Sequence, residues 1–161
     1  MNLSPLRSEA DLRTPLPIEN TKPCTIILVD DDKDDRLFAM AEFKKSAAIR
    51  DVLALPSGTD LISYMKEKGF YDHSVISYSP VLIVLDMQMP TMNGIEVLQD
   101  IRADHFLREI PIIVLSSQYD RETVREAYIN GATGYLTKPF NLEEIESFLP
   151  SAWQWPPSEL W

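Results

Sequence analysis

Acidic, hydroxyl and basic side chains stand directly after short apolar runs at four places in this chain. They are Asp30, Asp31 and Asp32 after residues 25–29, Asp86 after 81–85, Ser116 after 111–115, and Lys138 after 134–137. Crowded carboxylates repel unless a cation neutralises them, and Mg²⁺ binds one or two protein carboxylates together with phosphate oxygens. An Asp can itself accept a phosphoryl group, while Lys and Ser can hold phosphoryl oxygens. Brought together, these residues would support phosphoryl transfer to an aspartate beside Mg²⁺.

The apolar runs that precede these residues are typical of buried strands, and helical periodicity separates them. The expected strands are residues 25–29, 51–55, 81–85, 111–115 and 134–137, and the expected helices are 33–45, 57–69, 93–101, 121–130 and 141–148. Strands that alternate with helices predict a parallel sheet with right-handed crossovers. Sites in such sheets form at the carboxyl ends of the strands. All four groups are therefore expected at one edge.

Each group has a simpler explanation when it is taken alone. The acidic run can serve only as a helix start, Asp86 can open a loop, Ser116 can cap a turn, and Lys138 can be a solvated surface charge. The order of all four at successive strand ends favours the chemical interpretation.

The sequence resembles the receiver domain of two-component response regulators over about residues 25–149. The matching stretches are residues 26–32, 82–94, 111–117 and 134–140. The resemblance implies a flavodoxin-like (βα)5 fold, an α/β architecture with strand order 2-1-3-4-5.

The resemblance also implies roles for individual residues around the acidic cluster. Asp86 would be the phosphoacceptor, and Asp31 and Asp86 would bind Mg²⁺ through their side chains. Gln88 would bind the same ion through its backbone carbonyl, and Asp30 would assist through a bound water. Gln88 and Gln118 stand two positions after the acceptor and the switch hydroxyl, where family members tune dephosphorylation.

Three further roles follow from the same resemblance. Lys138 would contact the phosphoryl group, and its bond to Pro139 is expected to be cis. Ser116 would hydrogen-bond the phosphoryl group and move on activation, and Tyr135 would swing inward with it. Tyr135 can also be explained as a half-exposed strand aromatic.

The expected function is that of a stand-alone receiver and not of an enzyme acting on other substrates. A sensor histidine kinase or a phosphotransfer protein would supply the phosphoryl group, and a downstream protein would receive the signal. A narrower resemblance to single-domain regulators of phytochrome-type kinases rests on residues 34–36 and the segment 66–80. Two alternatives are a degenerate receiver that only docks and a phosphatase of the haloacid-dehalogenase type. The first would lack an acceptor, acid or Lys, and the second would need a later acidic pair and a cap.

The composition and net charge limit the classes of partner that the chain is expected to bind. The 161 residues carry a formal net charge of −10, which argues against direct binding to nucleic acid. We expect no output domain after residue 148, no secretory signal and no membrane insertion, and hence a cytoplasmic protein. The lone Cys24 implies no disulfide.

Three parts are expected along the chain. Residues 1–23 form an extended tail, 24–150 the receiver domain, and 151–161 a tail rich in Trp and Pro. The three tryptophans (Trp153, Trp155 and Trp161) can either cover the domain or form a contact with a partner, so a homodimer is left open.

Overall fold

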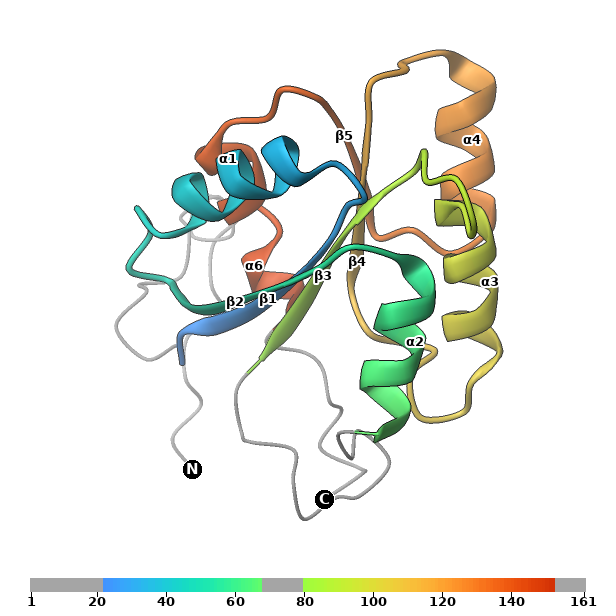
Figure 1. Ribbon diagram of the computed structural model, residues 1–161, viewed down its shortest axis with the longest axis horizontal. Helices are drawn as coiled ribbons and strands as arrows, with labels where there is room; N and C mark the ends of the chain where they lie inside the picture. Colours follow the sequence, from blue (N-terminus) through green and yellow to red (C-terminus); the bar gives the residue numbers. More distant parts are fainter. Residues whose placement is uncertain (1–21, 68–79, 153–161) are drawn as a thin grey trace, which may run out of the picture.

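Aliphatic and β-branched residues form five short parallel strands at the centre of the molecule. The computed structural model describes residues 22–67 and 80–152 (Figure 1). The strands are β1 (Cys24–Val29), β2 (Ile49–Leu55), β3 (Val81–Asp86), β4 (Ile112–Ser116) and β5 (Gly134–Thr137). Their order is β2-β1-β3-β4-β5, which confirms the predicted flavodoxin-like topology.

The strand register brings the carboxyl ends of the strands into line. Val29 of β1 pairs with Leu85 of β3, so the residues that follow these strands are neighbours. Asp86 pairs in turn with Leu115, one residue before the end of β4. This alignment places the acidic residues after β1 beside the last residue of β3.

Helices cover both faces of the sheet and bury its alternating side chains. The helices α1 (Lys33–Phe43), α5 (Leu142–Glu146) and α6 (Leu149–Ala152) pack on one face, where Ala39 and Phe43 are buried. The helices α2 (Gly58–Glu67), α3 (Gly94–Ala103) and α4 (Arg121–Ile129) cover the other (Figure 1). A strand that is buried on both faces has a continuous run of apolar residues in its sequence, and the strands here have such runs.

Polar caps fix where the helices near the site begin. The Asp32 carboxylate accepts hydrogen bonds from the backbone N–H groups of Asp34 and Asp35 at the start of α1. Asn93 and Asn141 form capping boxes at the starts of α3 and α5. Such caps satisfy backbone donors that would otherwise lack partners.

The C-terminal helix and several element boundaries differ from the sequence prediction. Strand β2 begins at Ile49 and not at residue 51, because Ile49 pairs with Cys24 of β1. The helix predicted over 141–148 is shorter, and the separate α6 follows it and contains the predicted boundary at residue 150. Pro150 lacks the N–H needed to continue α5 but suits a first helical turn. Ala152 is fully buried, so α6 belongs to the core.

Several predictions fall on residues that the structure does not describe. These are the N-terminal tail over 1–21, the helix stop at Gly69 with the loop that follows it, and the three tryptophans. Within the described residues, none of the helices has the length and apolar character that crossing a bilayer requires.

Candidate functional site

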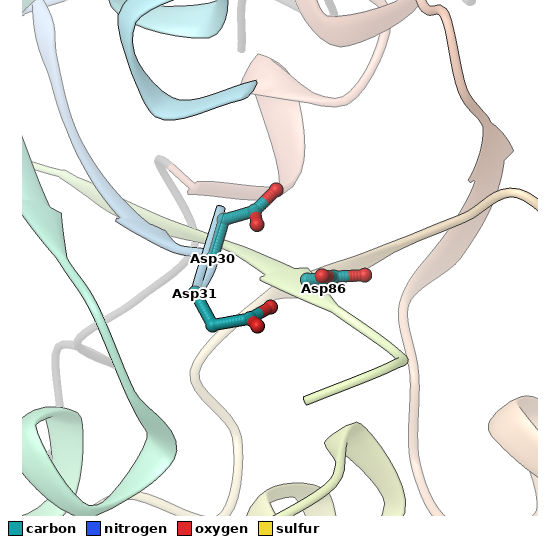
Figure 2. A group of neighbouring side chains, drawn as sticks. All are labelled: Asp30, Asp31 and Asp86. Carbon is teal, nitrogen blue, oxygen red and sulfur yellow. The ribbon is translucent and has the colours of Figure 1, made fainter. Parts of the chain in front are cut away.

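Three carboxylates meet at the carboxyl edge of the sheet. Asp30 and Asp31 follow β1, and Asp86 ends β3 (Figure 2). Each offers a carboxylate oxygen, and these oxygen atoms all lie within 4.8 Å of one another. Asp30 and Asp86 are buried, while Asp31 is exposed. Oxygen ligands at this spacing, with one side open to solvent, suit a hard divalent cation that keeps part of its water shell.

The first turn of α1 braces the loop that carries Asp30 and Asp31. The Arg36 guanidinium donates hydrogen bonds to the backbone carbonyls of Asp30 and Asp31, at 2.8 and 3.0 Å. The Asp30 carboxylate accepts a further bond from the N–H of Asp32 at 2.9 Å. Arg36 therefore holds the backbone of this loop, and the N–H of Asp32 holds the Asp30 carboxylate.

Lys138 reaches into the acidic cluster from the end of β5. Its Nζ lies 2.9 Å from Asp30 Oδ2, 2.9 Å from Asp35 Oδ2 and 3.5 Å from Asp86 Oδ2. Burial lowers the pKa of Lys138, but hydrogen bonds to Asp30 and Asp35 and the charge of Asp86 outweigh it and raise that pKa above its ordinary value. The ammonium group is thus kept charged. The Lys138–Pro139 bond is cis, as expected.

The surroundings of Asp86 disfavour its charged form. Burial, and then the negative charge of Asp30, raise the pKa of Asp86 to about 6. The Gln88 N–H, which donates to Asp86 Oδ1 at 3.2 Å, and the Lys138 ammonium offset only part of this effect. A cation placed among these carboxylates would relieve the cost of ionising Asp86.

The proposed switch residues are Ser116, at the end of β4, and Tyr135, in β5, and both contact Gln118 in the loop after β4. Ser116 is fully buried, and its Oγ accepts a hydrogen bond from the N–H of Gln118 at 3.1 Å. The Tyr135 hydroxyl donates to the carbonyl of Gln118 at 2.5 Å. Tyr135 is 8% exposed, so it is buried here and not half-exposed. The backbone N–H of Lys138 donates to the Ser116 carbonyl at 2.9 Å, which joins the ends of β4 and β5.

The structure thus brings all the predicted site residues to one edge, but it leaves their individual roles as predictions. It also adds contacts that the sequence did not indicate. Asp35 binds Lys138, and the Ser117 hydroxyl donates to the side-chain oxygen of Gln88 at 3.0 Å. A helix start after Asp32 places Asp35 in the first turn, which is a weak signal because acids are common there.

The family model of the response regulator receiver domain matches residues 26–149 of this chain. Among curated proteins, the response regulator Rcp1 of Synechocystis sp. is 31% identical over 127 residues, which are 79% of this chain and 84% of Rcp1.

Solved structures give the same result. The phosphorylated cyanobacterial phytochrome response regulator RcpA is 29% identical with a TM-score of 0.65, and the match covers 79% of this chain and 94% of RcpA. The Mn²⁺-bound form of Rcp1 is 30% identical with a TM-score of 0.60, and the match covers 79% of this chain and 89% of that one. The chain therefore belongs to the response regulator receiver domains of two-component signalling systems, and its acidic pocket lies at the carboxyl edge of their shared sheet.

Proposed function

We propose that this receiver domain is a phosphorylation-operated switch of a two-component phosphorelay, with Asp86 as the phosphoacceptor. The observation that carries the proposal is the position of the Asp86 carboxylate. It lies beside the carboxylates of Asp30 and Asp31 and 3.5 Å from the Lys138 ammonium. Asp31 is exposed, so this edge of the site is open to solvent. A nucleophile flanked by groups of both charges suits the transfer of an anionic phosphoryl group.

The donor would be the phosphohistidine of a sensor histidine kinase or of a phosphotransfer protein. An oxygen of ionised Asp86 forms the new O–P bond while the P–N bond to the donor imidazole breaks, and the imidazole nitrogen leaves with the electron pair. Lys138 would hold one of the phosphoryl oxygens by charge and hydrogen bond. Burial raises the pKa of Asp86, and Lys138 together with a cation at the site would favour its ionised, nucleophilic form.

Mg²⁺ is the proposed cofactor, and Asp30, Asp31 and Asp86 are the residues that would hold it, with the backbone carbonyl of Gln88. Their oxygen donors and their spacing fit such an ion. When bound, Mg²⁺ neutralises charge on the carboxylates and on phosphoryl oxygens. The Mn²⁺-bound structure of the relative Rcp1 supports a divalent cation in this family.

The output of the switch would pass through Ser116, Tyr135 and the loop between β4 and α4. A phosphoryl group on Asp86 adds charge and new acceptors beside that loop. The Ser116 hydroxyl would turn to the phosphoryl group, which would disturb its bond with Gln118 and, through the Gln118 carbonyl, the Tyr135 contact. This biases an equilibrium between two arrangements of the face that meets a downstream protein.

The chain would catalyse only its own phosphorylation and dephosphorylation, the latter tuned by Gln88 and Gln118. The similarity to a phytochrome response regulator makes a phytochrome-type sensor kinase the first partner to try. A test uses phosphoramidate, a small donor with a P–N bond, and follows its consumption by ³¹P NMR. The protein should consume it with Mg²⁺ and should not hydrolyse p-nitrophenyl phosphate. Turnover of the ester without use of the P–N donor would contradict the proposal.

A further inference from the structure

Asp35 is a fourth carboxylate at the site, and the proposed phosphoryl transfer assigns it no role. It lies in the first turn of α1, and its Oδ2 is 2.9 Å from Lys138 Nζ. Its side chain is 51% exposed, whereas that of Asp30, the other carboxylate at 2.9 Å, is 3% exposed. Lys138 is therefore held between a buried and a half-exposed carboxylate.

The two contacts leave one N–H of Lys138 available for the acceptor. A lysine ammonium has three N–H donors and no acceptor. Asp30 and Asp35 take two of them at 2.9 Å, and Asp86 Oδ2 lies further away, at 3.5 Å. The ammonium is thus placed next to Asp86 without being drawn into full contact with it.

The two carboxylates that contact the Lys138 ammonium come from different elements of the fold. They therefore hold the ammonium from two sides and restrict where it can lie. Asp30 follows β1, and Asp35 belongs to α1. The carboxylate of the cap Asp32 fixes the backbone N–H of Asp35 at 2.9 Å. A lysine side chain has a long flexible stem, and its ordering needs such contacts.

We propose that Asp35 is a positioning residue for phosphoryl transfer, which acts by holding Lys138 so that its third N–H faces the phosphoryl group on Asp86. The inference rests on the proposed function and deepens it. Loss of the Asp35 carboxylate leaves Lys138 with only Asp30 as a close partner. Its ammonium then spends part of its time away from the phosphoryl group.

Asp34 provides a matched control for this role. It is the preceding residue of the same helical turn, it is also exposed, and it carries the same charge. Among the described residues, Lys138 forms ion pairs with Asp30, Asp35 and Asp86 but not with Asp34. Replacing either Asp34 or Asp35 with Asn removes one negative charge near the site, but only the second change removes a charge that pairs with Lys138.

The experiment measures the affinity for beryllofluoride, a mimic of the phosphoryl group, in the presence of saturating Mg²⁺ by isothermal titration calorimetry. Asp35→Asn should weaken binding about two- to fivefold, the size expected for a half-exposed ion pair. Asp34→Asn should leave the affinity unchanged, and Asp35→Glu should restore most of it. In a Lys138→Met background, Asp35→Asn should have no further effect.

Two results would overturn the role of Asp35 while leaving the proposed function intact. The first is equal affinity of Asp35→Asn and Asp34→Asn. The second is tighter binding by Asp35→Asn, which would mean that Asp35 competes with the phosphoryl group for Lys138. A wild-type protein that binds no beryllofluoride and accepts no phosphoryl group would instead overturn the proposed function, and this inference with it.

Discussion

Replacing Asp86 with Asn should stabilise the fold while removing the proposed phosphoacceptor. The carboxylate side chain is 7% exposed, and its ionisation is disfavoured by burial and by the charge of Asp30. Asn has nearly the same size but carries no charge, and its side-chain oxygen can still accept from the N–H of Gln88. The variant therefore removes an electrostatic cost of the wild-type site without opening a cavity.

The size and the pH dependence of this effect follow from the pKa. The pKa of Asp86 is about 6 in the folded protein and 3.8 ordinarily, and each pH unit corresponds to about 1.4 kcal/mol. The upper limit is thus about 3 kcal/mol, and we expect a gain of about 1–3 kcal/mol at pH 8. Because the folded-state pKa is raised, protonation of Asp86 stabilises the wild type below pH 3.8, and this stabilisation is lost as the pH rises through 6. The advantage of Asp86→Asn should therefore be greatest above pH 7 and should vanish near pH 4.

Urea unfolding at several pH values, with a chelator present, measures this difference in the free energy of unfolding. Asp51→Asn is the control, because Asp51 is 68% exposed and its removal changes the net charge equally. That variant should lie within about 0.5 kcal/mol of the wild type. A destabilised Asp86→Asn at pH 8, or a gain that does not change with pH, would refute the reasoning. Saturating Mg²⁺ should stabilise the wild type more than Asp86→Asn, since a ligand stabilises the state that binds it.

Two further predictions concern the core. In Gly134→Ala the new methyl carbon would lie 2.4 Å from the Phe148 ring and 2.9 Å from the Ile113 side chain. The free energy of unfolding measured in urea titrations should therefore fall by about 1–3 kcal/mol, and adding Phe148→Leu should restore part of it. An unchanged free energy of unfolding would contradict this packing. Burial raises the pKa of the Cys24 thiol to about 12, so it should react with a disulfide reagent at pH 8 far more slowly in the folded protein than in denaturant; equal rates would contradict its burial.

The parallel sheet and the edge that carries the site could be predicted from the sequence pattern, and the order of the strands followed from the resemblance to receiver domains. Apolar runs that end in Asp30, Asp86, Ser116 or Lys138 mark the carboxyl ends of buried strands, and the parallel topology then places those ends together. The starts of two helices could also be predicted, because Asn is a favoured N-cap residue. Asn93 and Asn141 are the N-caps of α3 and α5 in the structure.

Contacts between side chains from distant elements could not be predicted in the same way. Asp35 and Lys138 are 103 residues apart, and their ion pair depends on how α1 packs beside the end of β5. The hydrogen bond between Ser117 and Gln88 likewise joins two loops whose relative position follows from packing. The sequence did not predict helix α6, because four residues are too few to show helical periodicity. Its position against the core follows from the burial of Ala152.

The central claim, that Asp86 accepts a phosphoryl group, is tested most directly by intact mass spectrometry after incubation with acetyl phosphate and Mg²⁺. The account predicts one added phosphoryl group in the wild type. The adduct should be labile to base, absent without Mg²⁺, absent in Asp86→Asn, and retained in the control Asp51→Asn. An adduct of the same extent in Asp86→Asn would contradict the assignment of the acceptor. A wild type with no adduct and no affinity for beryllofluoride would contradict the receiver chemistry itself.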